Sequence, residues 1–288
     1  MAEGIMERRL TVQGALDAAT ETLAKAGIEG PRRDATRLLG DLLDLTPAEV
    51  MLERGSVIEP DRRRWINRAV ERRAAGEPLA YVTGITGFRT LVLRSDPRAL
   101  IPRPETEGIV DRALALAAGG VALDVGTGTG CLALSLRAEG RYQRVFAVDI
   151  DRKALGLADH NRRHLGLEID LVLGDLGTAV ASGSVDLVVS NPPYVSESEY
   201  AQLGPEVRDF EPRLALASGV DGLDASRRLL HDGLRVLRPG GWMIMEVASA
   251  RGEALHGLAY ALGWRDLRVD EDLFGRPRYL VARREVGT

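Results

Sequence analysis

Two kinds of apolar spacing divide the chain. Up to about residue 77, apolar side chains recur only at helical intervals. Four segments there start or stop at helix signals: residues 10–26, 31–43, 46–54 and 60–75. Gly27 and Gly76 follow two of these ends, as expected of glycines that close helices, and prolines lie near three of the starts. Short helices joined by brief loops predict a small bundle.

The rest of the chain changes its pattern twice. Residues 79–94 are rich in β-type side chains with turn glycines at Gly84 and Gly87, which predicts a hairpin linker. From about residue 99, helical and strand patterns alternate, which predicts an α/β fold with a parallel sheet covered by helices on both faces. The expected strands are residues 121–125, 145–149, 169–173, 186–190, 242–247, 265–269 and 279–282, and the expected helices begin at residues 131, 151 and 251. We therefore predict a helical domain over residues 1–77, a linker over 78–98 and an α/β domain over 99–288.

Composition narrows the classes of function. The 288 residues carry a net charge of −4, which gives no basic footprint for nonspecific binding to nucleic acid. A single cysteine excludes an internal disulfide framework and fits a reducing cytosol. No stretch reaches the ~18 apolar residues of a membrane span, and the polar residues 1–9 do not resemble a signal peptide. We expect a cytoplasmic protein.

The first expected strand of the α/β region runs into a glycine-rich turn. Residues 121–125 lead into Gly126, Thr127, Gly128, Thr129 and Gly130, and a helix follows. Glycines in such a turn let a ligand approach the backbone. A dinucleotide fold wants a third glycine where Cys131 stands. The spacing instead resembles the S-adenosylmethionine loop of class I methyltransferases. A glycine-rich turn without a ligand is the alternative.

Three acids follow at the ends of the next strands. Asp149 lies about twenty residues past the glycine loop, where an acid can accept hydrogen bonds from ribose hydroxyls. A surface acid at a strand end is the alternative. Asp151 is better interpreted as a helix N-cap. Asp175 and Leu176 resemble the segment that brackets the adenine in this superfamily.

The tetrapeptide Asn191-Pro192-Pro193-Tyr194 follows a buried strand, residues 186–190. A polar Asn at the carboxyl end of a parallel strand points into the crevice where open α/β sheets bind ligands. The prolines stiffen the backbone, and a proline carbonyl comes without a neighbouring N–H. An Asn oxygen beside a proline carbonyl suits a substrate that presents an –NH2 group. The motif looks like that of methyltransferases acting on planar nitrogens; a merely stiff turn would explain the prolines but not the Asn.

The order of motifs along the chain resembles one family. These motifs are residues 78–84 (PLAYVTG), 101–107 (IPRPETE), 124–130, 191–194, 211–216 (EPRLAL) and 221–224 (DGLD). Nearly the whole chain is similar to the glutamine N5-methyltransferases of peptide chain release factors, the PrmC/HemK family.

The resemblance implies a fold, a reaction and a set of site residues. The fold is a Rossmann-like class I S-adenosylmethionine-dependent methyltransferase with a seven-stranded sheet, its last strand antiparallel, and a small N-terminal helical bundle that docks the substrate. The reaction is methyl transfer from S-adenosyl-L-methionine to the glutamine of the factor's Gly-Gly-Gln motif, which modulates translation termination. The implied cofactor residues are Gly126, Thr127, Gly128, Thr129, Gly130, Asp149, Asp175, Leu176 and Asn191. The implied substrate residues are Asn191, Pro192, Pro193 and Tyr194, with Asn191, Pro192 and Tyr194 catalytic.

Two places depart from the pattern of that family. Ala248 and Arg251 stand where the family usually has glycine and glutamine after Glu246. Arg89 and Thr90 replace an aromatic-glycine pair usual after Phe88. The first departure concerns the wall of the expected cofactor site, and the second concerns the site entrance.

The expected chemistry works by orientation. The Asn191 oxygen and the Pro192 carbonyl accept the two N–H hydrogens of an amide, which aims its nitrogen at the methyl group and stabilises the growing positive charge. Tyr194 stacks on the amide plane, and no metal is needed. Two alternatives stay open: a nucleic-acid amino-methyltransferase of the same fold, which would need a basic groove, and a non-catalytic binding module. Sequence-specific binding to nucleic acid is not expected.

Several other groups of residues are better explained by structural than by functional roles. Six arginines crowd one expected helix (Arg62, Arg63, Arg64, Arg68, Arg72 and Arg73) and could dock a partner, but a solvated surface is favoured. His160 and His164 have metal-ligand spacing without the Glu of a zinc-protease helix. Cys131 is expected to be a small packed residue, and Glu105 and Glu107 to lie in a first helical turn, where acids are favourable.

Overall fold

The protein is described by a computed structural model over residues 10–286. It divides into two units. One unit contains residues 10–85 together with 205–210, and the other contains residues 86–204 together with 211–286. Each unit has its own apolar core.

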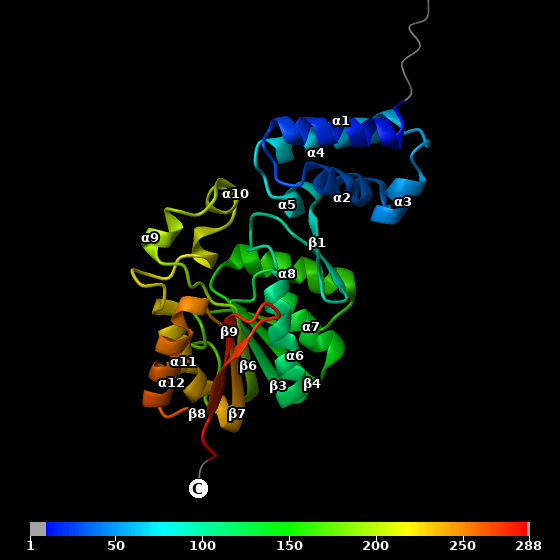
Figure 1. The fold of residues 1–288 in the computed structure, drawn as a ribbon. Coiled ribbons are helices and arrows are strands. Elements are labelled where there is room, and N and C mark those ends of the chain that lie inside the picture. The colour runs from blue at the N-terminus through cyan, green and yellow to red at the C-terminus, as the bar shows by residue number, and fades with distance from the viewer. Residues whose placement is uncertain (1–9, 287–288) are drawn as a thin grey trace, which may run out of the picture. The chain divides into compact units, whose positions relative to one another are not determined.

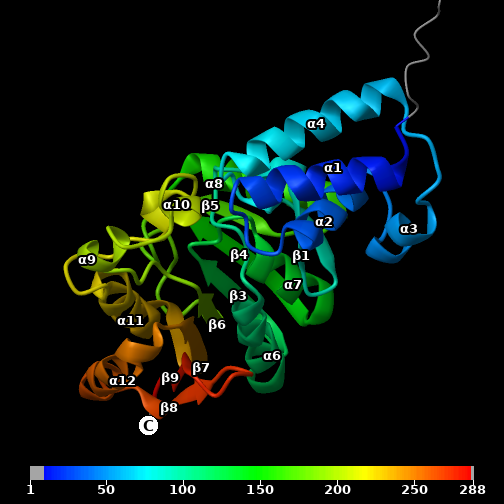
Figure 2. The same cartoon turned by 45° about the horizontal axis from the view of Figure 1, so that its top comes forward.

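The first unit is built from short helices. They are α1 (Val12–Lys25), α2 (Pro31–Leu43), α3 (Pro47–Leu52), α4 (Pro60–Ala74), α5 (Leu79–Thr83) and α10 (Pro205–Arg208). Thr11 caps α1, and Thr46 with Glu49 forms a capping box at α3. Leucines of α1 and α2 pack with Ile66 of α4 in a fully buried cluster, and Figure 2 shows these three helices alongside one another. The expected helical bundle is present.

The expected hairpin linker is only partly correct. Residues 79–83 form the helix α5 rather than a strand, and the hairpin consists of β1 (Ile85–Phe88) and β2 (Leu91–Arg94). Tyr81 and Val82 are buried, and Val82 joins the core of the helical unit. Burial against the helices therefore decides the conformation, since β propensity is weak and depends on context. Gly84, with φ +80°, ends the helix.

The second unit contains a seven-stranded sheet. Its strands are β3 (Gly119–Val125), β4 (Arg141–Asp149), β5 (Asp170–Leu173), β6 (Val185–Ser190), β7 (Leu237–Glu246), β8 (Arg265–Glu271) and β9 (Pro277–Arg283). The order across the sheet is β5-β4-β3-β6-β7-β9-β8. The last strand in the sequence, β9, is antiparallel to both its neighbours, as expected. The order reverses between β3 and β6, and ligands bind outside the carboxyl ends of strands at such a point.

Helices cover both faces of this sheet. Figure 1 shows α6 (Glu107–Leu116) and α7 (Cys131–Glu139) on one side, and α11 (Asp224–Val236) and α12 (Gly252–Ala261) on the other. The helix α8 (Arg152–Leu165) packs on β4 and β5. The remaining short elements are η1 (Pro104–Thr106), α9 (Glu197–Tyr200), η2 (Arg213–Ala215) and η3 (Ser249–Arg251). Neighbouring residues of β3 are buried in opposite faces, Ala122 toward α7 and Leu123 toward α11, which explains why the central strands read as continuous apolar runs.

Candidate active site

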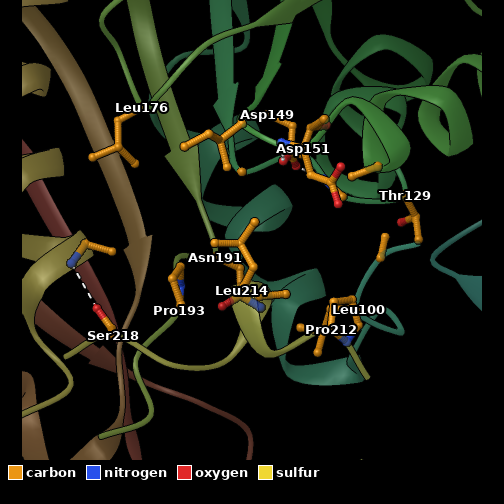
Figure 3. A pocket seen from close by; sticks show the side chains of 18 of the residues that line it. Leu100, Thr129, Asp149, Asp151, Leu176, Asn191, Pro193, Pro212, Leu214 and Ser218 are labelled. Atoms are coloured by element: carbon orange, nitrogen blue, oxygen red, sulfur yellow. Dashed lines mark hydrogen bonds between the residues drawn. The ribbon is translucent and has the colours of Figure 1, made fainter. Parts of the chain in front are cut away.

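A cavity of about 390 Å³ opens at the carboxyl ends of β3, β4 and β6. Its walls come from the loops after these strands, from residues 98–106 and from residues 212–228. Figure 3 shows Asp149, Asn191, Pro212 and Leu214 around it. Its volume lies in the usual range for sites that hold small molecules and cofactors. The cavity is lined by nine of the residues that the sequence predicted for the site: Gly126, Thr127, Gly128, Thr129, Asp149, Asp175, Leu176, Asn191 and Pro193.

The glycine-rich turn needs its glycines for different reasons. Gly126 and Gly128 line the cavity with φ of +73° and +56°. A side chain at Gly126 would meet no protein atom within 4 Å, so the space beside it is open to a ligand. Gly130 is not among the cavity-lining residues. It precedes α7 with φ +86°, and a Cβ there would lie 3.1 Å from Leu134 Cδ1.

The buried carboxylate of Asp124 holds this turn in place by hydrogen bonds. Its Oδ2 accepts hydrogen bonds from Thr127 Oγ1 at 2.7 Å and from the Ala133 backbone N–H at 3.2 Å. Burial raises the pKa of Asp124 to about 7, and the nearby Asp149 carboxylate acts in the same direction. Asp124 therefore joins the turn to the first residues of α7.

Asp149 lies where the sequence predicted it, at the end of β4. One carboxylate oxygen accepts from the Gly128 N–H and the other from the Asp151 N–H, both at 2.9 Å. Burial raises the pKa of Asp149. A carboxylate has about four lone-pair positions, so each oxygen can take a further hydrogen bond from a ligand hydroxyl. Asp151 caps α8 by accepting from the Lys153 N–H, and its role as N-cap is confirmed.

The loop after β5 contacts the helix α11. Asp175 and Leu176 both line the cavity. The Asp175 carboxylate pairs with Arg228 of α11 at 2.6 Å, and Arg228 also lines the cavity. An acid that pairs with an arginine and an apolar side chain therefore lie next to each other in this part of the cavity wall.

The Asn-Pro-Pro-Tyr segment is held by residues that sequence spacing did not reveal. Asn191 Nδ2 donates to Thr106 Oγ1 at 3.0 Å, and Thr106 Oγ1 donates to Glu246 Oε2 at 2.7 Å. Tyr194 Oη donates to the other oxygen of Glu246 at 3.5 Å. Asn191 and Pro193 line the cavity, whereas Pro192 and Tyr194 are not among its lining residues. Thr106 and Glu246 are 85 and 55 residues away along the chain, which is why no local spacing could indicate them.

Burial changes the acidity of this cluster. Burial raises the pKa of Tyr194 to about 12, with the Glu246 charge acting in the same direction. Burial also raises the pKa of Glu246, and the hydrogen bond from Thr106 opposes the rise. The tyrosine is therefore a neutral hydroxyl donor at physiological pH.

Two of the specific sequence motifs meet beside the cavity. Glu211 is 4% exposed and accepts from the Ile101 N–H at 3.2 Å and from Arg103 Nη2 at 2.5 Å. Tyr279 of β9 donates to the Glu105 carbonyl at 2.6 Å. These contacts hold residues 101–106 in place, including Thr106. Glu105 and Glu107 themselves are not among the cavity-lining residues.

The departures from the expected pattern have local partners. Arg89 adopts φ +53° in the hairpin turn and pairs with Glu139 of α7 and Asp111 of α6, each at 2.7 Å. Arg251 donates to the Asp221 carbonyl at 2.7 Å and to Glu199 of α9 at 2.6 Å. Neither Ala248 nor Arg251 is among the residues that line the cavity.

The remaining candidates lie elsewhere or are packed. His160 and His164 stack with ring centroids 6.3 Å apart, outside the cavity lining. Cys131 lines the cavity, but burial raises the pKa of its thiol to about 12, which keeps it neutral. The six arginines of α4 do not share one surface: Arg73 is buried against Asp34, whereas Arg62, Arg63, Arg64 and Arg68 are exposed.

Comparisons with known proteins agree with this geometry. Residues 14–84 match the model of the PrmC N-terminal domain, and residues 109–204 match that of the methyltransferase small domain. The release factor glutamine methyltransferase of Nitratidesulfovibrio vulgaris is 40% identical over 283 residues, which is 96% of each chain. That of Cereibacter sphaeroides is 41% identical over 271 residues, 93% of this chain and 97% of the relative.

Solved structures share the fold at much lower identity. A methyltransferase from Pyrococcus furiosus has a TM-score of 0.54 at 19% identity, covering 79% of this chain and all of that chain. The catalytic domain of hMettl16 has a TM-score of 0.56 at 17% identity, covering 81% of this chain and 86% of that chain. Both support the class I methyltransferase fold.

Proposed function

Since the chain belongs to the release factor glutamine methyltransferase family, we propose that it methylates the side-chain amide nitrogen of the glutamine in the Gly-Gly-Gln motif of peptide chain release factors. The observation that carries this proposal is the position of Asn191. It lies at the end of β6, lines the cavity, and has its Nδ2 engaged by Thr106. Its oxygen is the group that suits an incoming –NH2.

The residues present fit S-adenosylmethionine. Gly126 and Gly128 leave room beside the backbone, and Asp149 retains acceptor positions for the ribose hydroxyls. Asp175 and Leu176 would receive the adenine. When bound, this cofactor supplies a methyl group on a positively charged sulfur, which passes to nitrogen with loss of a proton.

The chain contributes orientation and electrostatics. An amide nitrogen is a poor nucleophile because its lone pair is delocalised into the carbonyl. The Asn191 oxygen and the Pro192 carbonyl accept the two N–H hydrogens, which fixes the nitrogen and stabilises positive charge as it develops there. Correct placement of two reactants is worth roughly 7–11 kcal/mol of the barrier. Pro193 lines the cavity and confines the amide plane, whereas Tyr194 lies outside the lining and contacts Glu246 through its hydroxyl.

We also propose how the chain finds its substrate. Residues 1–77 serve as a docking domain, the hairpin region over 78–98 as a linker, and residues 99–288 as the catalytic domain. Among residues 10–286 no helix is long and apolar enough to cross a bilayer. Release factors act on ribosomes, so a cytoplasmic location follows from the proposed substrate, and sequence-specific binding to nucleic acid is not required.

The proposed function is tested by a methylation assay with labelled S-adenosylmethionine. Purified release factor, the same factor with glutamate in place of the Gly-Gly-Gln glutamine, and duplex DNA serve as separate acceptors, and mass spectrometry locates the added methyl group. We expect label only on the factor that carries the glutamine. Label on DNA, or none on any acceptor, would contradict the proposal.

A further inference from the structure

We propose that Thr106 and Glu246 act as positioning residues that fix which way round the Asn191 side-chain amide points. This inference rests on the proposed function, because it concerns how Asn191 meets the acceptor amide. Its consequence is selection of an amide over a carboxylate in the substrate. Glu246 is not among the cavity-lining residues. Thr106 does line the cavity, but its hydroxyl is engaged by Asn191 on one side and by Glu246 on the other, so both residues act on the acceptor through Asn191.

The three side chains form a directed chain of hydrogen bonds. Asn191 Nδ2 donates to Thr106 Oγ1 at 3.0 Å, and Thr106 Oγ1 donates to Glu246 Oε2 at 2.7 Å. The contact from Tyr194 Oη to Glu246 Oε1 is 3.5 Å long. Glu246 thus receives a hydroxyl at each of its oxygens and connects both ends of the Asn-Pro-Pro-Tyr segment.

The direction of this chain follows from the chemistry of its members. Thr106 Oγ1 donates to Glu246 Oε2, and a threonine hydroxyl has a single proton to give. This hydrogen bond favours the ionised form of Glu246, against the rise in its pKa that burial causes, and an ionised carboxylate can only accept. With that proton directed at Glu246, Thr106 can only accept from Asn191. The NH2 group of Asn191 must therefore face Thr106, and its oxygen is presented on the opposite side. The two ends of an amide are otherwise nearly alike in shape.

Burial makes this arrangement hard to replace with water. Thr106 is 2% exposed and Glu246 is 1% exposed. A buried polar group that loses its partner carries the full desolvation cost, so the alternative orientation of the amide is disfavoured. Contacts of residues 101–106 with Glu211 and Tyr279 keep the Thr106 backbone in place. The motifs at 101–107 and 211–216 therefore both contribute to the position of Thr106.

An oxygen facing the acceptor suits a glutamine and rejects a glutamate. A glutamine NH2 donates to the Asn191 oxygen, whereas a carboxylate would place oxygen against oxygen. If Asn191 could turn over, its NH2 would face the substrate and favour the carboxylate instead. Discrimination between the two side chains therefore measures the orientation of Asn191 without any methyl transfer.

The first experiment compares Thr106→Val, Thr106→Ser and wild-type protein. Binding of two Gly-Gly-Gln-type peptides, one with glutamine and one with glutamate at the acceptor position, is measured by calorimetry. We expect Thr106→Val to lower the preference for glutamine by about tenfold, the loss of about one buried hydrogen bond. kcat should fall by a similar factor, while the Kd for S-adenosylmethionine stays within about twofold. Thr106→Ser keeps the hydroxyl and should restore both values.

A matched control and a second variant separate positioning from general damage. Thr86→Val changes a buried threonine of β1 outside the cavity lining and should leave the preference unchanged. Glu246→Gln keeps the shape but can donate to Thr106, which frees the hydroxyl to turn, so it should resemble Thr106→Val. It also serves if Thr106→Val fails to fold. In an Asn191→Ala background, Thr106→Val should cause no further loss of kcat, because the two act through one group.

The outcomes distinguish the two proposals. A wild-type protein that methylates the factor, with Thr106→Val and Glu246→Gln both retaining the full preference for glutamine, would overturn the positioning role alone. A wild-type protein that transfers no methyl group to the factor would overturn the proposed function and the positioning role together.

Discussion

Three buried carboxylates lie at or next to the carboxyl ends of strands in the sheet: Asp124 on β3, Asp149 on the adjacent β4 and Glu246 on β7. Burial raises the pKa of each. Each is held by short hydrogen bonds from backbone N–H groups or hydroxyls, and each supports a different part of the cavity wall. The acids therefore have an effect on stability that depends on pH.

Asp124 gives the clearest prediction about pH. Its folded-state pKa of about 7 lies above its ordinary value of 3.8, so the native state binds the proton more tightly than the unfolded state does. Its stabilising contribution is complete below about pH 4 and is lost as the pH rises through 7. Asp124→Asn keeps an acceptor oxygen and should flatten this dependence. Urea unfolding at pH 5 and pH 8 measures the change, and an equal slope in both proteins would contradict the assignment.

Asn191→Ala tests the proposed catalytic role. We expect kcat to fall by about 10²–10³, as for removal of one preorganised group that stabilises developing charge. The Kd for S-adenosylmethionine should change much less. Single-turnover methylation and calorimetry measure the two quantities separately. Turnover close to wild type would remove Asn191 from the chemical step.

Asp149→Asn tests the proposed ribose contact. One carboxylate oxygen becomes an NH2 group, which cannot accept a hydrogen bond. We expect the Kd for S-adenosylmethionine to rise by about 10- to 100-fold, the range for loss of a hydrogen bond to a charged group. Asp159→Asn on α8, outside the cavity lining, is the control. An unchanged Kd would exclude Asp149 from the cofactor site.

At the scale of elements, the turn between β3 and α7 can be tested against a matched glycine. Gly126 and Gly166 have φ of +73° and +65°, and neither would bring a new Cβ within 4 Å of another group. Replacing either with alanine should cost roughly 1–2 kcal/mol of stability, because L-residues disfavour this conformation. Of these two glycines, Gly126 lines the cavity and Gly166 does not. Thermal unfolding should therefore respond to both changes, and cofactor affinity to Gly126→Ala alone.

The elements predicted from the sequence share strong periodicity or clear end signals. Pro31–Leu43 has both and was predicted to the residue, and β3 was found because its second half is an apolar run interrupted only by Asp124. The prediction for residues 79–83 was wrong because their conformation depends on packing against the other helices of the unit, which the local sequence does not show. The helix α11 was not predicted, although its apolar residues recur at helical spacing.

The sequence located those residues of the cavity that directly follow strands. Asp149 and Asn191 come at strand ends, where topology alone brings them to one edge. Thr106 and Glu246 reach the same place from distant segments, and their role depends on which atoms face each other. The sequence holds no periodic signal for such a contact.

At the scale of the whole molecule, one buried ion pair joins separate segments of the helical unit. Arg73 pairs with Asp34 of α2 at 2.9 Å and with Glu206 of α10 at 3.2 Å, and the Arg73 side chain is 7% exposed. Arg73→Ala should destabilise this unit by about 3 kcal/mol, since it removes the buried partner of Asp34 and leaves only the longer contact of 3.6 Å with the exposed Arg33. Limited proteolysis near residues 205–210 and chemical unfolding measure the loss. Arg63→Ala, an exposed arginine of the same helix, should have no measurable effect.

The assignment of residues 205–210 to the helical unit has a consequence for how this protein can be cut or recombined. The chain passes between the units three times, after residues 85, 204 and 210, so the helical unit is not a simple leading module. A shortened protein that starts at residue 86 would retain the α10 segment but lose the side chains against which it packs. Chimaeras between relatives would have to exchange the N-terminal segment and residues 205–210 together. Substitutions in α2 or α4 have to remain compatible with this short segment, which follows more than a hundred residues later in the chain.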